Sequence, residues 1–146
     1  MSTRVVLDST AVAALFFRDP LSEEIARSVS EYDELHTVDL VYAELGSVAW
    51  KRIRIFQEER GQVMKSLKAA LGFVENDCKV ISAKDFLPRA VSFGLENEIA
   101  VYDSLFLYAA RKLKTKLLST DEKLFHKIQL RLDKAIRNLV YIPAKE

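Results

Sequence analysis

Residues 6–17, VLDSTAVAALFF, place one carboxylate, Asp8, and two hydroxyls, Ser9 and Thr10, between two apolar runs. The apolar residues just before the acid do not alternate with polar ones, which is typical of a strand buried on both faces of a parallel sheet. A helix is expected to begin directly after the acid, at Ser9. Asp8 therefore ends a predicted first strand, and ligands of open α/β sheets bind at the carboxyl ends of strands.

Similar short apolar runs recur along the chain and alternate with helical patterns. We expect further strands at residues 36–38, 80–81, 116–119 and 139–142. We expect helices that start at Asp19 with Pro20 in the first position, cover about 40–55, 59–74 and 100–113, and follow Asp85 and Asp121. The alternation predicts an α/β fold, an open sheet with helices on both faces.

The length of 146 residues and the absence of repeats or Pro/Gly/Ser-rich linkers predict one domain, residues 1–146. Hydrophobic residues at 49% and charged residues at 29% are typical of a soluble globular protein. No apolar stretch approaches the ~20 residues of a membrane span. Because no long apolar core precedes Asp8, we expect no secretory signal, a cytoplasmic location and no membrane partner.

Cysteine and histidine chemistry is unpromising in this sequence. The single cysteine, Cys78, excludes an internal disulfide and a cysteine-based metal cluster. We interpret it as a small core residue in a reducing compartment. The two histidines, His36 and His126, are far apart, which argues against a zinc site. Side chains with oxygen atoms therefore remain as the candidates for binding a metal ion.

The net charge of +1 hides an asymmetry along the chain. Residues 1–50 hold three basic and nine acidic side chains, whereas residues 111–137 hold nine basic and three acidic ones. One interpretation is a polyanion bound through metal on the acidic side and through Lys and Arg on the other. The alternative is a set of solvated helix faces.

Three further acids share with Asp8 an apolar setting. Glu44 and Asp103 each interrupt the apolar stripe of a predicted helix. Asp121 directly follows a predicted strand, as Asp8 does, so the two are expected to face the same crevice. Two carboxylates ~5 Å apart repel by about 3 kcal/mol at an effective dielectric constant of ~20, so such a cluster requires cations.

Each acid also has a structural alternative. The acids that follow strands can be helix N-caps, and Asp103 can respond to the helix dipole in a first turn. Glu44 can form a salt bridge with Lys51 or Arg52. The four acids together favour a shared site over four separate roles.

Four motifs resemble the PIN-domain family, and most closely the VapC-type toxin ribonucleases of toxin–antitoxin pairs. They are VLDSTA with Asp8, YAELGSVAWK with Glu44, VYDSLFLYAA with Asp103 and LLSTDEKL with Asp121, in family order over nearly the whole chain. The resemblance implies a PIN-like parallel sheet of strand order 3-2-1-4-5 flanked by helices. It also implies a homodimer, a small antitoxin protein as partner, and single-stranded or structured RNA as substrate.

The same resemblance implies a metal-dependent nuclease that hydrolyses phosphodiester bonds in single-stranded RNA. The four acids would be catalytic residues that bind Mg²⁺ or Mn²⁺ directly or through water, with Thr10 and Ser119 as supporting hydroxyls. Ser104 stands where many members carry Ala, a change that does not affect the assignment. Mg²⁺ suits such a site because it keeps several waters and takes few carboxylates.

Basic and aromatic side chains are candidates for contact with RNA. The carboxylates repel the phosphates, so Lys and Arg must supply grip. The basic candidates follow three of the acids: Lys51, Arg52 and Arg54; Arg111, Lys112, Lys114 and Lys116; Lys123 and Lys127. For the aromatic residues, including Tyr102, core or interface packing is the default at their helical spacing, and one or two can stack on a base.

Other functions stay open at this point. One is a PIN-domain RNA-processing nuclease, and another is a non-catalytic PIN scaffold that binds RNA or protein. A third is a phosphoryl-transfer α/β domain, either a dehalogenase-like phosphatase or a receiver. Thr10 stands where the phosphatase needs a second Asp, and the receiver's acidic pair at the first strand is missing.

Overall fold

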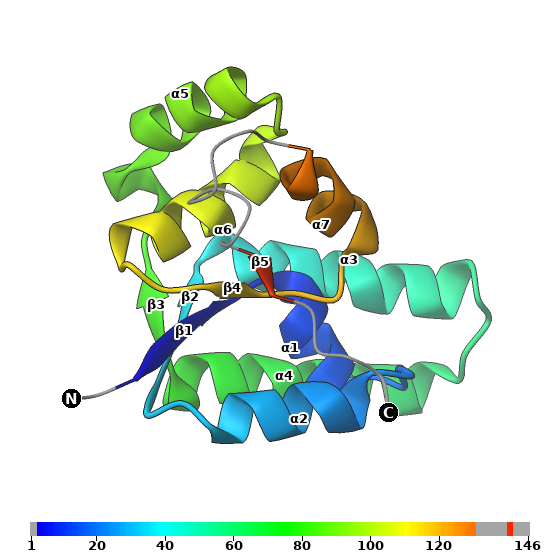
Figure 1. Ribbon diagram of the computed structural model, residues 1–146. Helices are drawn as coiled ribbons and strands as arrows, with labels where there is room; N and C mark the ends of the chain where they lie inside the picture. The colour runs from blue at the N-terminus through cyan, green and yellow to red at the C-terminus, as the bar shows by residue number, and fades with distance from the viewer. Residues whose placement is uncertain (1–2, 131–139, 142–146) are drawn as a thin grey trace.

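The computed structural model describes residues 3–130 and 140–141. Its centre is a parallel five-stranded sheet of order β3-β2-β1-β4-β5, which confirms the expected order 3-2-1-4-5 (Figure 1). The strands are β1 (Arg4–Leu7), β2 (Glu34–Val38), β3 (Cys78–Ile81), β4 (Leu117–Leu118) and β5 (Val140–Tyr141). The ends of the predicted last strand, at residues 139 and 142, lie outside the described residues.

Helices cover both faces of the sheet, as expected. In Figure 1, α1, α2 and α4 lie below the sheet and α5, α6 and α7 above it, while α3 and α4 run side by side. The helices are α1 (Ser9–Phe16), α2 (Ser22–Ser30), α3 (Leu40–Arg54), α4 (Arg60–Asp77), α5 (Leu87–Asn97), α6 (Val101–Lys112) and α7 (Glu122–Gln129), with a 3₁₀ turn η1 (Ala83–Asp85). The predicted helix positions are therefore confirmed, with shifted ends.

The core is densest around β1. Val5, Val6 and Leu7 are fully buried because the strand is central in the sheet and covered on both faces. The run at residues 80–81 behaves differently, since β3 is an edge strand and Val80 is 38% exposed. The expectation that this run resembles the buried first strand is wrong on that point.

The start of α2 also differs from the prediction. The side chain of Asp19 accepts a hydrogen bond from the N–H of Leu21 at 2.7 Å, which forms a turn before the helix. Helix α2 then begins at Ser22. Asp19 therefore caps a turn, and Pro20 lies in that turn and not in the helix.

Cys78 lies at the junction of α4 and β3 and is half-buried. Burial raises the pKa of its thiol to about 12. A thiol that stays protonated is a poor nucleophile, which agrees with the interpretation of a packing residue. Within the described part of the chain, no helix is both long enough and apolar enough to cross a membrane.

Candidate active site

Two of the predicted acids meet because two strands are neighbours. β1 and β4 pair in parallel with Leu7 beside Leu118, so both strands end at the same edge of the sheet. Asp8 follows β1, and its N–H donates to the carbonyl of Leu118 at 3.3 Å. Asp121 follows β4 three residues later and begins α7. The expectation that Asp8 and Asp121 face the same edge agrees with this geometry.

Thr10 and Ser119 lie between these two acids. The hydroxyl of Thr10 donates to Asp8 Oδ1 at 2.6 Å and accepts from the N–H of Thr120 at 2.9 Å. The Ser119 hydroxyl lies 3.2 Å from the Thr10 hydroxyl and also hydrogen-bonds to the Asp8 carboxylate. Ser119 in turn accepts from the N–H of Asp121 at 3.0 Å. The two hydroxyls thus join the ends of β1 and β4.

Asp8 is buried, at 5% exposure, and its carboxylate is also the N-cap of α1, with the Ala11 N–H donating to Oδ1 at 3.0 Å. Burial raises its pKa to about 6, and the nearby charge of Asp121 acts in the same direction. The hydrogen bonds from Ser119, Thr10 and Ala11 oppose this rise. The cap alternative is therefore correct, and it leaves the carboxylate free to act as a ligand as well.

Glu44 reaches the site from α3 and is half-buried. Burial raises its pKa, and the charges of Asp8 and Asp103 raise it further. The hydroxyl of Ser9, next to Asp8, hydrogen-bonds to the Glu44 carboxylate and lowers its pKa. Ser9 was not among the predicted site residues, although its place beside Asp8 is a sequence signal that points to it.

Asp103 lies in the first turn of α6 and is also half-buried. Burial raises its pKa, the charge of Asp121 adds to this rise, and Lys127 on α7 opposes it. Asp8 interacts electrostatically with Glu44 and with Asp121, and Asp103 interacts with the same two residues. The four acids thus form a closed ring in which each interacts with two others. We call these four residues the acid ring.

The acid ring is open in its present geometry. Between residues 3 and 130, no three His, Cys, Asp or Glu side chains are close enough to hold a metal ion by themselves. A hydrated cation does not need three protein ligands in contact, since Mg²⁺ usually retains several waters and contacts one or two carboxylates. Burial and mutual repulsion raise the pKa of three of these acids, and a cation between them relieves the repulsion.

The salt-bridge alternative for Glu44 is wrong for Arg52. The Arg52 guanidinium instead pairs with Glu58 at 3.1 Å, donates to the carbonyl of Arg18 at 2.9 Å, and lies 5.3 Å from the ring centre of Phe17. These contacts hold the end of α3 against the end of α1. Arg52 is therefore a structural residue, and its expected place among the RNA-contacting residues is not supported.

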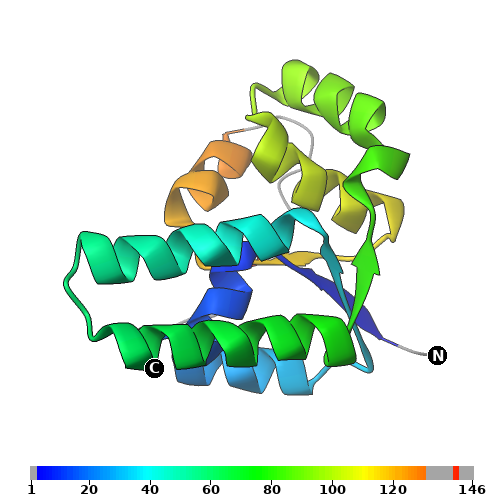
Figure 2. The same cartoon turned by 180° about the vertical axis from the view of Figure 1, so that it is seen from behind.

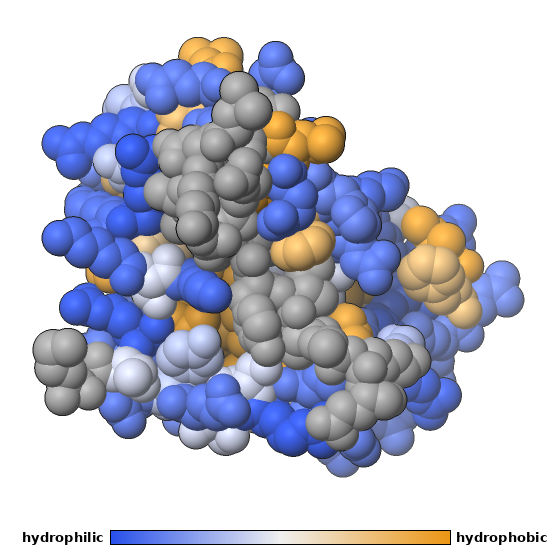
Figure 3. Space-filling view, in the orientation of Figure 1, coloured by the Kyte–Doolittle hydropathy of each residue, from blue (hydrophilic) through white to orange (hydrophobic). Residues whose placement is uncertain are grey.

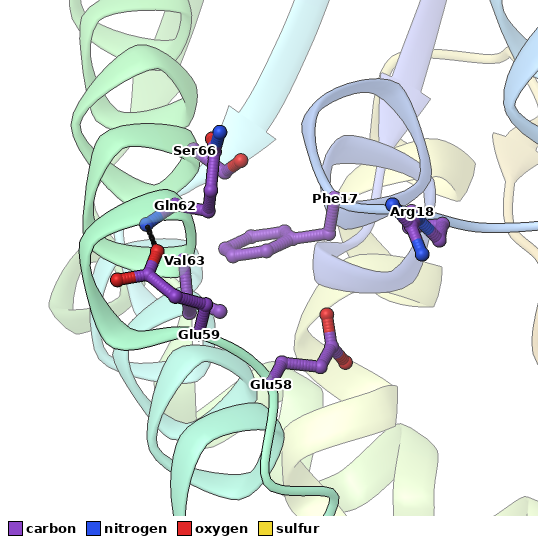
Figure 4. Close-up of a pocket in the computed structure, with 7 residues that line it drawn as sticks. All are labelled: Phe17, Arg18, Glu58, Glu59, Gln62, Val63 and Ser66. Carbon is purple, nitrogen blue, oxygen red and sulfur yellow. Dashed lines mark hydrogen bonds between the residues drawn. The ribbon is translucent and has the colours of Figure 1, made fainter.

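The three residues that Arg52 contacts, Phe17, Arg18 and Glu58, line a cavity that is separate from the acids (Figure 4). In this view the ring of Phe17 points from the end of α1 toward α4, where Glu59 caps the helix through the N–H of Gln62 at 2.6 Å. No member of the acid ring lines this cavity. Among the other basic candidates, Lys51 lines a second cavity together with Glu44, and Lys127 is near enough to Asp103 to lower its pKa. Residues 131–137 of the basic segment lie outside the described residues.

The chain and its fold have clear relatives. Residues 5–129 match the PIN domain family, and the chain belongs to this family. The protein Ribonuclease VapC3 of Pyrobaculum aerophilum is 32% identical over 124 residues, which cover 85% of this chain and 94% of that protein.

Two solved structures share the fold. PAE2754 of Pyrobaculum aerophilum superposes with a TM-score of 0.65 at 20% identity, over 86% of this chain and 79% of that one. A chain of a toxin–antitoxin complex from Klebsiella pneumoniae superposes with a TM-score of 0.64 at 15% identity, over 97% and 99%. The PIN-like architecture expected from the four motifs is confirmed.

Proposed function

We propose that this protein is a metal-dependent endoribonuclease that hydrolyses single-stranded RNA and acts as the toxin of a toxin–antitoxin pair. The observation that carries the proposal is the acid ring, in which four carboxylates from separate elements are coupled at the carboxyl end of a parallel sheet. A relative at 32% identity bears the name ribonuclease, and a structure of the same fold comes from a toxin–antitoxin complex.

In this proposal Asp8, Glu44, Asp103 and Asp121 hold Mg²⁺ or Mn²⁺, partly through water. When bound, the cation lowers the pKa of a water molecule and neutralises charge on the substrate phosphate. The chain itself orients the ligands. Thr10 and the N–H of Ala11 fix one oxygen of Asp8, and the cap of α7 fixes Asp121, whose Oδ1 accepts from the Leu124 N–H at 3.1 Å.

Positive side chains at the rim bring the RNA to this acidic surface. Lys51 and Lys127 come from different helices, α3 and α7, and lie beside members of the acid ring. Their positive charges would offset the repulsion between the four carboxylates and an approaching phosphate. No Ser, Cys or His nucleophile is required for this chemistry.

The products of RNA cleavage test the proposal. Attack by water leaves a 5′-phosphate and a 3′-hydroxyl, whereas attack by the ribose 2′-hydroxyl leaves a 2′,3′-cyclic phosphate. We expect 5′-phosphate ends, detected by end-group analysis of a labelled single-stranded RNA after incubation with Mg²⁺ or Mn²⁺. Cyclic phosphate ends would contradict hydrolysis at the acid ring.

We propose that the whole chain, residues 1–146, acts as one domain and forms a cytoplasmic homodimer. The toxin role also requires a protein partner. Apolar side chains gather where α3 ends (Figure 3), and Ile55 and Phe56 there are 56% and 68% exposed. Exposed apolar groups of this kind mark interaction sites. An arginine of a small antitoxin would pair well with the acid ring. Co-purification with the product of an adjacent short gene tests this role.

A further inference from the structure

A cavity of about 410 Å³ opens beside the acid ring and is lined by one of its members, Glu44, and by Ser9, which hydrogen-bonds to Glu44. Its other walls include Ser47 and Lys51 from α3 and Tyr102 from α6. In Figures 1 and 2, α3 lies below α6 and α7 in the view, and the lining residues show that α3 and α6 meet at this cavity. The cavity is near the lower end of the usual size for ligand pockets, so it suits one nucleotide better than several.

Tyr102 has the properties of a stacking surface. Its side chain is 61% exposed, although it directly precedes the half-buried Asp103. Among the described residues, no aromatic ring or guanidinium is found stacked on it, whereas Tyr108 on the same helix packs against Phe86 and Phe93. Core packing of Tyr102, one of the two kinds of packing expected from its helical spacing, is therefore wrong. Its exposed side chain forms part of the cavity wall.

Lys51 adds a positive charge to the same cavity. Its ammonium group forms no ion pair within residues 3–130, in contrast to Arg52, whose guanidinium is bound to Glu58. A phosphate beside the cavity would therefore meet an unengaged cation. Ser47, exposed on the same face of α3 and one turn after Glu44, offers a hydroxyl to a base edge.

We infer that this cavity is a subsite for one unpaired base of the RNA, next to the phosphate that is cut. The inference rests on the proposed ribonuclease function. Tyr102 stacks on the base and Lys51 contacts an adjoining phosphate, so that binding of the base positions the scissile phosphate over the acid ring. Stacking tolerates every base, so the subsite recognises an unpaired nucleotide more than a particular sequence.

The test uses a labelled single-stranded RNA with one abasic residue placed at each position around the cleavage point. The wild-type protein is compared with Tyr102→Leu, Tyr102→Phe and Lys51→Met. Tyr42→Leu, a tyrosine of α3 outside this cavity, and Lys65→Met, an exposed lysine of α4, are the matched controls. The measured quantity is kcat/KM for each pair of protein and RNA.

We expect one abasic position to reduce wild-type kcat/KM by roughly 5-fold to 150-fold, the range for loss of one stacked base. Tyr102→Leu should show the same loss on intact RNA and no further loss at that position, while Tyr102→Phe and both controls behave as wild type. Lys51→Met should weaken binding at every position and reduce its salt dependence. Equal cleavage by Tyr102→Leu and wild type, or an unchanged abasic profile, would overturn the inference.

A binding measurement separates this inference from the proposed function. The same RNAs are titrated into Asp8→Asn and into Asp8→Asn/Tyr102→Leu, with fluorescence anisotropy as the readout. If the wild type cuts no RNA, the proposed function fails, yet weaker RNA binding by the double variant still supports the subsite. Equal RNA binding by the two variants overturns it. If the double variant lost antitoxin binding but kept RNA binding, the cavity would be assigned to the protein partner. That result would also overturn the inference.

Discussion

Asp8 shows how a structural role and a chemical role coincide in one side chain. As N-cap of α1 it accepts the Ala11 N–H, and the same oxygen accepts the Thr10 hydroxyl. Both bonds fix the direction of the carboxylate in a site where burial raises its pKa to about 6. The fold thus holds an acid in a place where its charge is costly, and a bound cation would make that charge favourable.

The free energy of unfolding should depend on pH through Asp8. Its pKa rises from 3.8 to about 6 on folding, so the folded state retains a proton that the unfolded chain releases. This contribution is fully present below pH ~4 and is lost as the pH rises through ~6, by about 3 kcal/mol in total. Asp8→Asn keeps the cap and removes the charge, so it should stabilise the metal-free protein by up to about 3 kcal/mol at pH 8.

Urea unfolding in chelator at pH 8 and at pH 4 measures this effect. At pH 4 the stabilisation by Asp8→Asn should largely disappear. Asp85→Asn, which removes an exposed carboxylate, serves as the control for a change in net charge. A destabilised Asp8→Asn at pH 8, or an equal difference at both pH values, would refute the idea that the buried charge is costly.

Thr10 is the residue whose hydroxyl links both strand ends. Thr10→Val removes the donor to Asp8 and leaves the Thr120 N–H and the Ser119 hydroxyl without this partner. We expect a loss of about 1–3 kcal/mol in the free energy of unfolding, together with slower RNA cleavage. Thr10→Ser keeps the hydroxyl and should retain most of both. Equal stability of the Val and Ser variants would rule out the linking role.

At the scale of elements, the guanidinium of Arg52 connects α3 to the end of α1 and to the start of α4. Arg52→Met removes the ion pair with Glu58, the bond to the Arg18 carbonyl and the contact with Phe17. We expect it to lower the free energy of unfolding by about 1–2 kcal/mol and to leave RNA cleavage unchanged. Arg54→Met, at an exposed position of the same helix, is the control, and an equal effect of both would disprove the connection.

The sequence predicted most elements because their signals are local. Non-alternating apolar runs mark the strands, and Asp8 and Asp121 mark helix starts directly after two of them. The start of α2 was missed because Asp19 bonds to its own turn, which no helical periodicity reports. The exposure of Val80 was missed as well: the order 3-2-1-4-5 implied by the family resemblance places β3 at the edge, but the apolar run itself carries no signal of that position.

At the site, the sequence predicted the acids but not all that surrounds them. Glu44 and Asp103 were found because each breaks an apolar stripe, a signal carried by a single helix. The bond from Ser9 to Glu44 and the cavity shared by Lys51 and Tyr102 join different elements, so no spacing within one segment reports them. The contacts of the Arg52 side chain could not be predicted for the same reason.

At the scale of the whole molecule, the sheet order determines where the chemistry can occur. The central pair β1 and β4 delivers Asp8 and Asp121 to one edge, α3 brings Glu44, and α6 brings Asp103. Four elements from distant parts of the sequence thus contribute one carboxylate each. Metal binding and RNA cleavage should therefore respond together to a change in any of these acids.

The most direct test of this account is the cleavage rate of a single-stranded RNA by the wild type and by Asp8→Asn, each with Mg²⁺ or Mn²⁺ and with chelator. We predict that the wild type cleaves the RNA with metal and not with chelator. With metal, the cleavage rate of folded Asp8→Asn should be lower by at least ~100-fold. Circular dichroism confirms that the variant is folded. Cleavage that persists in both chelator and Asp8→Asn would contradict the claim that the acid ring is a metal-dependent catalytic site.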